Sequence, residues 1–173
     1  AFFSTVEVIG EAGRGSGCLV SEGGLLLTNW HVLRGFDGAV SEDIYVAVSF
    51  SQQVPPQELF KAELIEYDEK TDLALLQIES GLYDQPLPRD YDFPFFTLAE
   101  TGLQQLGQPL SFIGYPNGGG SGSKVSVSLT RGIVSGFEQG ANGFLIKTDA
   151  VLTPGNSGGA AINAYYELVG LPT

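Results

Sequence analysis

Short apolar runs, separated by glycines, prolines and polar residues, follow one another along this chain. Several of them alternate with a period of two: polar and apolar residues alternate in 124–129, and β-branched residues occupy every second position, 44, 46 and 48, of the run 44–48. That period places every second side chain on the same face, which is typical of a half-buried β-strand. The pattern predicts strands at residues 5–9, 17–20, 25–28, 44–50, 62–67, 73–78, 109–113, 124–129, 132–136, 144–147 and 168–171.

The spacing of these runs indicates the fold class. Turns recur about every 8–12 residues, which favours a sandwich or barrel over alternating strands and helices. No segment keeps a helical period for three turns, and 24 glycines and 9 prolines break the chain. We therefore expect an all-β protein.

Composition changes partway along the chain and suggests two units. Residues 1–100 carry 17 acidic and 5 basic side chains, whereas residues 101–173 carry 3 of each. Residues 81–94 are rich in Asp, Pro and Tyr, as exposed linkers are. We predict an N-terminal unit over 1–80, a linker over 81–105 and a C-terminal unit over 106–173. The glycine-rich residues 114–123 are expected to form a mobile hairpin connection.

The net charge of −12 narrows the range of partners. An acidic surface repels phosphate backbones and anionic lipids, so we expect no nucleic acid partner. No apolar run approaches the ~18 residues of a membrane helix, so no membrane insertion is expected either. The charge fits a solubilising surface or, alternatively, steering of cationic peptides.

The two ends of the sequence and its one cysteine give smaller hints. Cys18 excludes an intrachain disulfide and is expected to be a buried small hydrophobe. The start at Ala1 has neither a basic region nor a cleavage motif, so we expect a processed or trimmed form.

Ser157 is the candidate nucleophile for acyl transfer. It lies in the sequence TPGNSGG, residues 153–159, where flanking glycines leave the hydroxyl unshielded. We expect Gly155, Asn156 and Ser157 to form an oxyanion hole, with the N–H groups of Gly155 and Ser157 as donors. Taken alone, the segment is equally consistent with a glycine-rich turn that contains an incidental serine.

A base and an orienting acid complete the proposed chemistry. His31, the one histidine, follows an apolar run and is expected at a strand end, where it could take and return a proton. Asp72 directly precedes an apolar strand and could hold the imidazole in the correct tautomer. Asp68 and Asp149 are rivals for that role on composition alone. We expect neither metal nor cofactor.

These three segments, in the order His, Asp, Ser, resemble chymotrypsin-like serine proteases, and most of all the bacterial HtrA/Deg-type trypsin-like peptidases. The matching motifs are TNWHV at 28–32, DLALL at 72–76 and GNSGG at 155–159. The resemblance implies two six-stranded antiparallel β-barrels, the second complete or cut short at its C-terminus. It also implies His31, Asp72 and Ser157 as a catalytic triad, polypeptide substrates and an extracytoplasmic location, with an oligomer allowed by family likeness.

The departures from the family pattern bear on activation and specificity. Asn156 replaces the aspartate that pairs with a new N-terminus in trypsin-like zymogens, so that activation route is not expected. The sequence has no PDZ domain and stops at Thr173, so we expect a truncated chain or a pocket wall supplied elsewhere. The resemblance assigns Val151, Leu152 and Thr173 to the substrate pocket, whose apolar floor would favour apolar P1 residues.

Three functions fit the sequence. The leading one is an active serine endopeptidase. The second is a protease-like peptide-binding or regulatory module that is inactive in this truncated form, and the third is an esterase with the same triad. An α/β-hydrolase is excluded because the serine segment is not a G-x-S-x-G elbow and no helical pattern follows it.

Overall fold

The computed structural model describes all residues except 12, 36, 101, 117–125 and 141–142. Within that part of the chain there are eleven strands, one α-helical turn and one 3-10 turn. In chain order the elements are η1 (Phe2–Ser4), β1 (Thr5–Gly10), β2 (Arg14–Leu19), β3 (Leu25–Thr28), α1 (Trp30–Leu33), β4 (Ile44–Val48), β5 (Gln57–Asp68), β6 (Leu73–Gly81), β7 (Pro109–Gly114), β8 (Ser128–Gly140), β9 (Gly143–Thr148), β10 (Ala160–Ile162) and β11 (Leu168–Gly170).

The first six strands form a closed antiparallel barrel in the order β1-β2-β3-β6-β5-β4. Their inward side chains alternate with outward ones, and the barrel interior is filled by aliphatic residues such as Leu26, Val46 and Leu76. Phe93, which follows the last strand of the barrel, packs into the same core. Burial of these side chains is the main stabilising contribution to this half of the protein.

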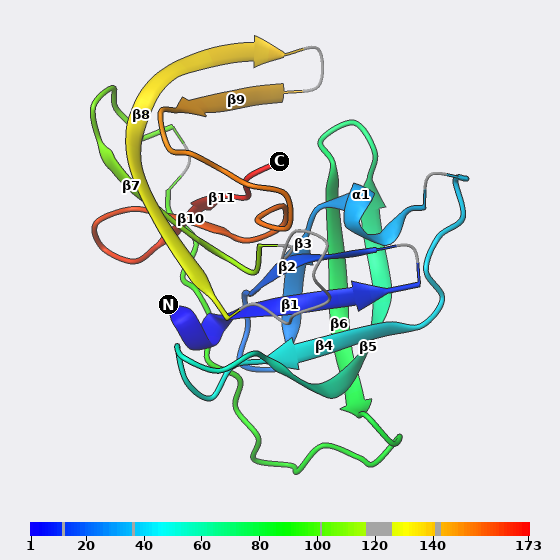
Figure 1. Ribbon diagram of the computed structural model, residues 1–173. Coiled ribbons are helices and arrows are strands. Elements are labelled where there is room, and N and C mark those ends of the chain that lie inside the picture. The colour runs from blue at the N-terminus through cyan, green and yellow to red at the C-terminus, as the bar shows by residue number, and fades with distance from the viewer. Residues whose placement is uncertain (12, 36, 101, 117–125, 141–142) are drawn as a thin grey trace.

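The remaining strands form a curled five-stranded sheet in the order β11-β10-β7-β8-β9. β8 is long, and its pairing with β9 shifts register between Val134 and Gly136, where a bulge bends a strand. Figure 1 shows β8 curving over β7 and carrying β9 around one side of the sheet. The all-β prediction with a chymotrypsin-like pair of barrels is confirmed, and the described part of the second unit is an open half-barrel.

The strand predictions differ from the structure in places. The run at 124–129 lies partly outside the described residues, as does most of the glycine-rich loop at 114–123. β10 was not predicted, and His31 lies in the helical turn α1, so its predicted place at a strand end is wrong.

The segment between the two sheets contacts both of them. Phe96 donates its N–H to the carbonyl of Leu19 in β2, and the N–H of Ala99 donates to Leu168 in β11. Phe96 is buried against Cys18, Ile113 and Ile162, in a cluster that joins the two sheets. The division at residues 80 and 105 stays a prediction.

Candidate active site

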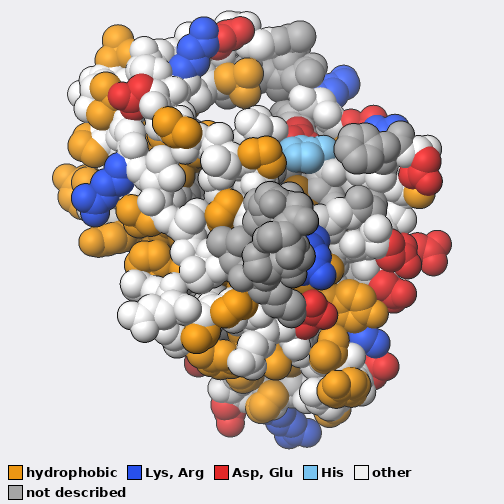
Figure 2. Space-filling view, in the orientation of Figure 1, with side chains coloured by type: hydrophobic (Ala, Val, Ile, Leu, Met, Phe, Trp, Pro, Cys, Tyr) orange, Lys and Arg blue, Asp and Glu red, His pale blue; other side chains and the backbone are white. Residues whose placement is uncertain are grey.

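A one-turn helix presents His31. β3 ends at Thr28 and α1 begins at Trp30, so that Trp30, Val32 and Leu33 turn into the first barrel core. The remaining residue of the turn, His31, faces outward with its side chain 51% exposed. Its imidazole is visible at the surface in Figure 2. Burial of its three neighbours therefore fixes the base while keeping the ring accessible.

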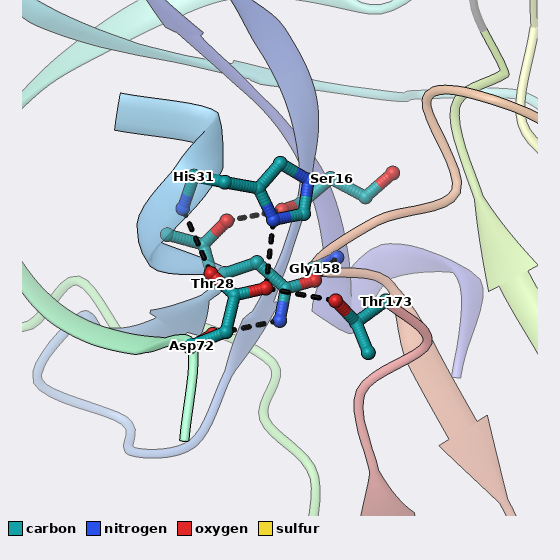
Figure 3. Close-up of polar contacts among 7 residues, drawn as sticks. Ser16, Thr28, His31, Asp72, Gly158 and Thr173 are labelled. Atoms are coloured by element: carbon teal, nitrogen blue, oxygen red, sulfur yellow. Dashed lines mark hydrogen bonds and ion pairs between the residues drawn. The ribbon is translucent and has the colours of Figure 1, made fainter. Parts of the chain in front are cut away.

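The Asp72 carboxylate orients the His31 imidazole through hydrogen bonds. Asp72 Oδ2 lies 2.7 Å from His31 Nδ1, and Oδ1 accepts the backbone N–H of His31 at 2.9 Å. Thr173 donates its hydroxyl to the same Oδ2 at 2.8 Å. Figure 3 shows these contacts converging on one carboxylate. An ionised carboxylate is an acceptor only, so the Nδ1 proton points to Asp72 and Nε2 is free to accept.

The Asp72 backbone adopts a left-handed conformation with φ of 55°. For a residue with a side chain this conformation costs about 1–2 kcal/mol, and Asp is among the few that visit it. The Asp72 carbonyl offsets the cost because it accepts the N–H of Trp30 at 3.1 Å and the Asn29 amide at 2.8 Å. The backbone is thus held where the carboxylate meets the imidazole, and strain of this kind is found preferentially at functional sites.

Ser157 follows a tight turn of the second sheet. Asn156 donates its N–H to the Thr153 carbonyl at 3.1 Å, and Gly155 has φ of 96°. Proline at the second position and glycine with positive φ at the third are the pattern of a type II turn. Ser157 lines a cleft of about 190 Å³ with Leu152, Thr153, Pro154, Asn156, Pro172 and Thr173.

The first barrel holds the backbone on both sides of Ser157. Ser16 donates its N–H to the Ser157 carbonyl and its hydroxyl to the Gly155 carbonyl, both at 2.8 Å. Asn29 Oδ1 accepts the Gly158 N–H at 2.6 Å. Gly158 has φ of 79°, and a Cβ atom there would overlap the Ser16 carbonyl. Only glycine therefore lets the loop approach β2 so closely.

The backbone donors of the turn differ in their partners. The Asn156 N–H is used within the turn, and its buried side-chain Oδ1 has no partner among the described residues. The N–H groups of Gly155 and Ser157 have no acceptor within the described part of the chain. These two remain as candidate donors to a developing oxyanion.

The structure places some of the predicted site residues in contact and leaves others without a direct contact. His31 and Asp72 are in direct contact, and Thr173 hydrogen-bonds Asp72 while also lining the cleft that contains Ser157. Over the described residues, the Ser157 hydroxyl makes no hydrogen bond, to His31 or elsewhere. Leu152 lines the cleft, whereas Val151 is 76% exposed and is not among its lining residues. The assignment of Val151 to the pocket stays a prediction.

Three residues make contacts at the site that were not predicted from the sequence. Ser16 and Asn29 hold the nucleophile loop, and the Thr173 hydroxyl reaches Asp72. Each of these contacts joins residues about 100 or more positions apart. Asn29 lies within the TNWHV motif that carried the resemblance, but nothing local in the sequence indicates what Asn29 or Ser16 binds.

Cys18 lies where the two sheets meet, next to the loop that carries Ser157. Its thiol is fully buried and approaches the Gly158 carbonyl at 3.5 Å. Burial raises the pKa of this thiol far above its usual value, because the thiolate would lose its hydration. The buried position agrees with the prediction from sequence.

We expect a disulfide reagent to leave Cys18 unmodified in the native protein near pH 8, because the raised pKa and burial suppress the thiolate. The measurement is the absorbance released by Ellman's reagent, and the control is the same protein in denaturant, where one thiol should react. Rapid modification of the folded protein would contradict the buried, protonated state.

The described residues contain neither a cluster of metal-binding side chains nor a helix that could span a membrane. Outside the positions 12, 36, 101, 117–125 and 141–142, no three His, Cys, Asp or Glu side chains lie close enough to share a metal ion. No helix in that same part of the chain has the length and apolar character needed to span a bilayer.

Comparisons with known proteins agree with this geometry. The model of the trypsin-like peptidase domain matches residues 15–171. A probable periplasmic serine endoprotease DegP-like of Halomonas elongata is 31% identical over 91% of this chain and 28% of its own length. A serine protease Do-like HtrA of Lactococcus lactis subsp. lactis is 30% identical over 97% of this chain and 38% of its own length.

A solved structure extends the likeness to three dimensions. The crystal structure of the serine endoprotease from Yersinia pestis superposes with a TM-score of 0.74 at 29% identity. The alignment covers 100% of this chain and 54% of that one. This chain therefore spans only about a third of the length of these curated relatives, and about half of the solved structure.

Proposed function

Because this chain belongs to the trypsin-like peptidase domain family, we propose that it is a serine endopeptidase domain using His31, Asp72 and Ser157. The observation that carries the proposal is the 2.7 Å contact between His31 Nδ1 and Asp72 Oδ2, beside a cleft that contains Ser157. A serine hydroxyl becomes a nucleophile only with a base to take its proton, and a histidine oriented by a hydrogen-bonded carboxylate supplies that base.

The proposed reaction proceeds through an acyl-enzyme. His31 Nε2 takes the Ser157 hydroxyl proton as Oγ attacks the carbonyl carbon of the scissile peptide bond. The carbonyl π electrons move onto oxygen, where the N–H groups of Gly155 and Ser157 stabilise the negative charge. When the carbon–nitrogen bond breaks, the imidazolium returns the proton to the leaving amine. Water then repeats the sequence and releases the new carboxylate.

The cleft favours uncharged substrate side chains. Leu152, Pro154 and Pro172 supply apolar surface, and none of the described residues that line the cleft is charged. Burying a lysine or arginine there without a counter-ion is costly. We therefore expect apolar P1 residues. The acidic side chains, which gather over the first barrel in Figure 2, disfavour nucleic acid partners.

The names of the relatives also bear on the cellular location of this chain. Several relatives are named periplasmic serine endoproteases, which supports an extracytoplasmic location for this chain. An oligomer stays a prediction from family likeness.

A second function is favoured by one observation. Among the described residues the Ser157 hydroxyl has no hydrogen bond to His31, as expected for a protease-like module that binds peptides without cutting them. Apo sites often have such loose geometry, so an active peptidase remains the leading proposal.

Labelling with a fluorophosphonate probe tests the proposal. We expect one covalent adduct, located on Ser157 by peptide mass spectrometry, because we propose His31 as the base that activates this hydroxyl. Heat-unfolded protein is the control and should not react. A folded protein that binds peptides but resists the probe would favour the inactive module, and hydrolysis of esters without hydrolysis of peptides would favour an esterase.

A further inference from the structure

The side chain of Asn29 joins the two loops that carry the proposed acid and nucleophile. Its amide nitrogen donates to the Asp72 carbonyl at 2.8 Å, and its amide oxygen accepts the Gly158 N–H at 2.6 Å. Asn29 is 2% exposed, so neither end has water as an alternative partner. Among the described residues, no other side chain hydrogen-bonds both the Asp72 backbone and the loop around Ser157.

The position of Asn29 in the chain suggests helix capping, but its contacts do not. It precedes α1 with an extended backbone (φ −79°, ψ 144°), as an N-cap residue does. Its side chain nevertheless makes no capping hydrogen bond. Both of its amide groups are used instead for the two loops, which lie 43 and 129 residues away in the sequence.

The two hydrogen bonds of the Asn29 side chain, which we call the Asn29 bridge, require one donor and one acceptor. One end must donate to a carbonyl and the other must accept from an N–H, which an amide does and a carboxylate or an alkyl group does not. Ser16 and Cys18 also contact the nucleophile loop, but neither reaches Asp72. Because Asn29 is two residues from His31, a single side chain relates the positions of base, acid and nucleophile.

We propose that Asn29 is a positioning residue that sets the place of Asp72 relative to the Ser157 loop. The proposal rests on the proposed serine peptidase function. Its effect comes through Asp72, whose left-handed backbone is held in part by the Asn29 amide. Displacing a reacting group by about 1 Å can cost about 100-fold in rate, so a lost bridge should be felt in catalysis.

The kinetic test compares Asn29→Asp with Asn163→Asp. Asn29→Asp keeps the acceptor for Gly158 but faces the Asp72 carbonyl with an oxygen that cannot donate. Asn163 is a matched control, since its buried amide also bonds both ways, to Glu167 and to the N–H of Tyr165, but within the hairpin of β10 and β11. We expect kcat to fall about 10- to 100-fold for Asn29→Asp, with KM within about threefold.

The control should keep its kcat after correction for the folded fraction, taken from each variant's thermal melt. Equal effects of the two substitutions on kcat would overturn the proposal. So would a change in the Asn29 variant that disappears once the folded fraction is accounted for, since that is the result of a structural role alone.

Amide hydrogen exchange gives a measurement that needs no activity. The Gly158 N–H donates to Asn29 Oδ1 at 2.6 Å and also to the Pro172 carbonyl at 3.2 Å, so it should exchange much more slowly than the Gly155 N–H, which has no acceptor within the described residues. In Asn29→Ala, Gly158 exchange should become faster, and the low-field resonance of the His31 Nδ1 proton should shift. Gly158 exchange that is equally slow with and without the Asn29 amide would overturn the proposal, because the Pro172 carbonyl would then account for the protection.

The two proposals fail in different ways. A protein whose Gly158 exchange becomes faster in Asn29→Ala, but which neither reacts with the probe nor cuts peptides, would overturn the proposed function and support the role of Asn29 in holding the loop. A protein that cuts peptides but is indifferent to Asn29→Asp would support the function and overturn the role of Asn29.

Discussion

Replacing Ser157 by alanine is expected to lower kcat for peptide hydrolysis by about 10⁶-fold, the size typical of removing the nucleophile of a serine protease. The substitution removes the hydroxyl that we propose as the nucleophile, while the cleft and the backbone donors stay. KM should therefore change little. Initial rates on a fluorogenic peptide with an apolar P1 residue measure both quantities.

The partner substitution supplies a control for that result. His31→Ala should cost about as much as Ser157→Ala, and the double variant should cost no more than either, because nucleophile and base act as one unit. Additive losses would contradict the proposed division of roles. Substantial hydrolysis by a homogeneous Ser157→Ala protein would mean that another group attacks the substrate.

Asp72→Asn is expected to lower kcat by about 10⁴-fold, as loss of the orienting carboxylate does in triads of this kind. The carboxylate accepts three hydrogen bonds, from His31 Nδ1, the His31 N–H and Thr173. An amide nitrogen facing Nδ1 would move the imidazole proton to Nε2, which then cannot accept from Ser157. Asparagine tolerates the left-handed backbone, so the fold should persist.

Asp68→Asn is the matched control, four residues away in the same hairpin. The Asp68 pKa is lowered because its carboxylate accepts the Lys70 N–H and the Thr71 hydroxyl. This carboxylate is fully exposed and contacts no residue of the proposed triad. Peptide hydrolysis at pH 7.5 should therefore be unaffected. Equal losses in the two variants would show that the charge of the hairpin, and not the contact with His31, matters.

The strands could be predicted where an apolar or alternating run is long enough to be seen. Residues 44–48 form such a run and become β4, but β10 contains only three residues, all buried, and gives no pattern to detect. The helical turn α1 is too short for a helical period to appear. In both elements tertiary packing, and not local preference, decides the conformation.

The candidate site was predictable only as far as its chemistry is local. His31 and Asp72 stood out because each lies at the edge of an apolar run, and the structure joins them. The roles of Asn29 and Ser16 depend on which loop of the other sheet reaches them, which no local pattern encodes. The glycines predicted a turn at Ser157, but nothing in the sequence predicted the direction in which the Ser157 hydroxyl points.

The dependence of the Ser157 loop on β2 and α1 bears on how the protein is made. During synthesis His31 and Asp72 emerge well before Ser157, and the loop gains its hydrogen bonds to Ser16 and Asn29 only when the second sheet docks on the first barrel. On the proposed function, we therefore expect peptidase activity to appear only after both halves of the protein have folded and docked, which limits digestion of nascent chains.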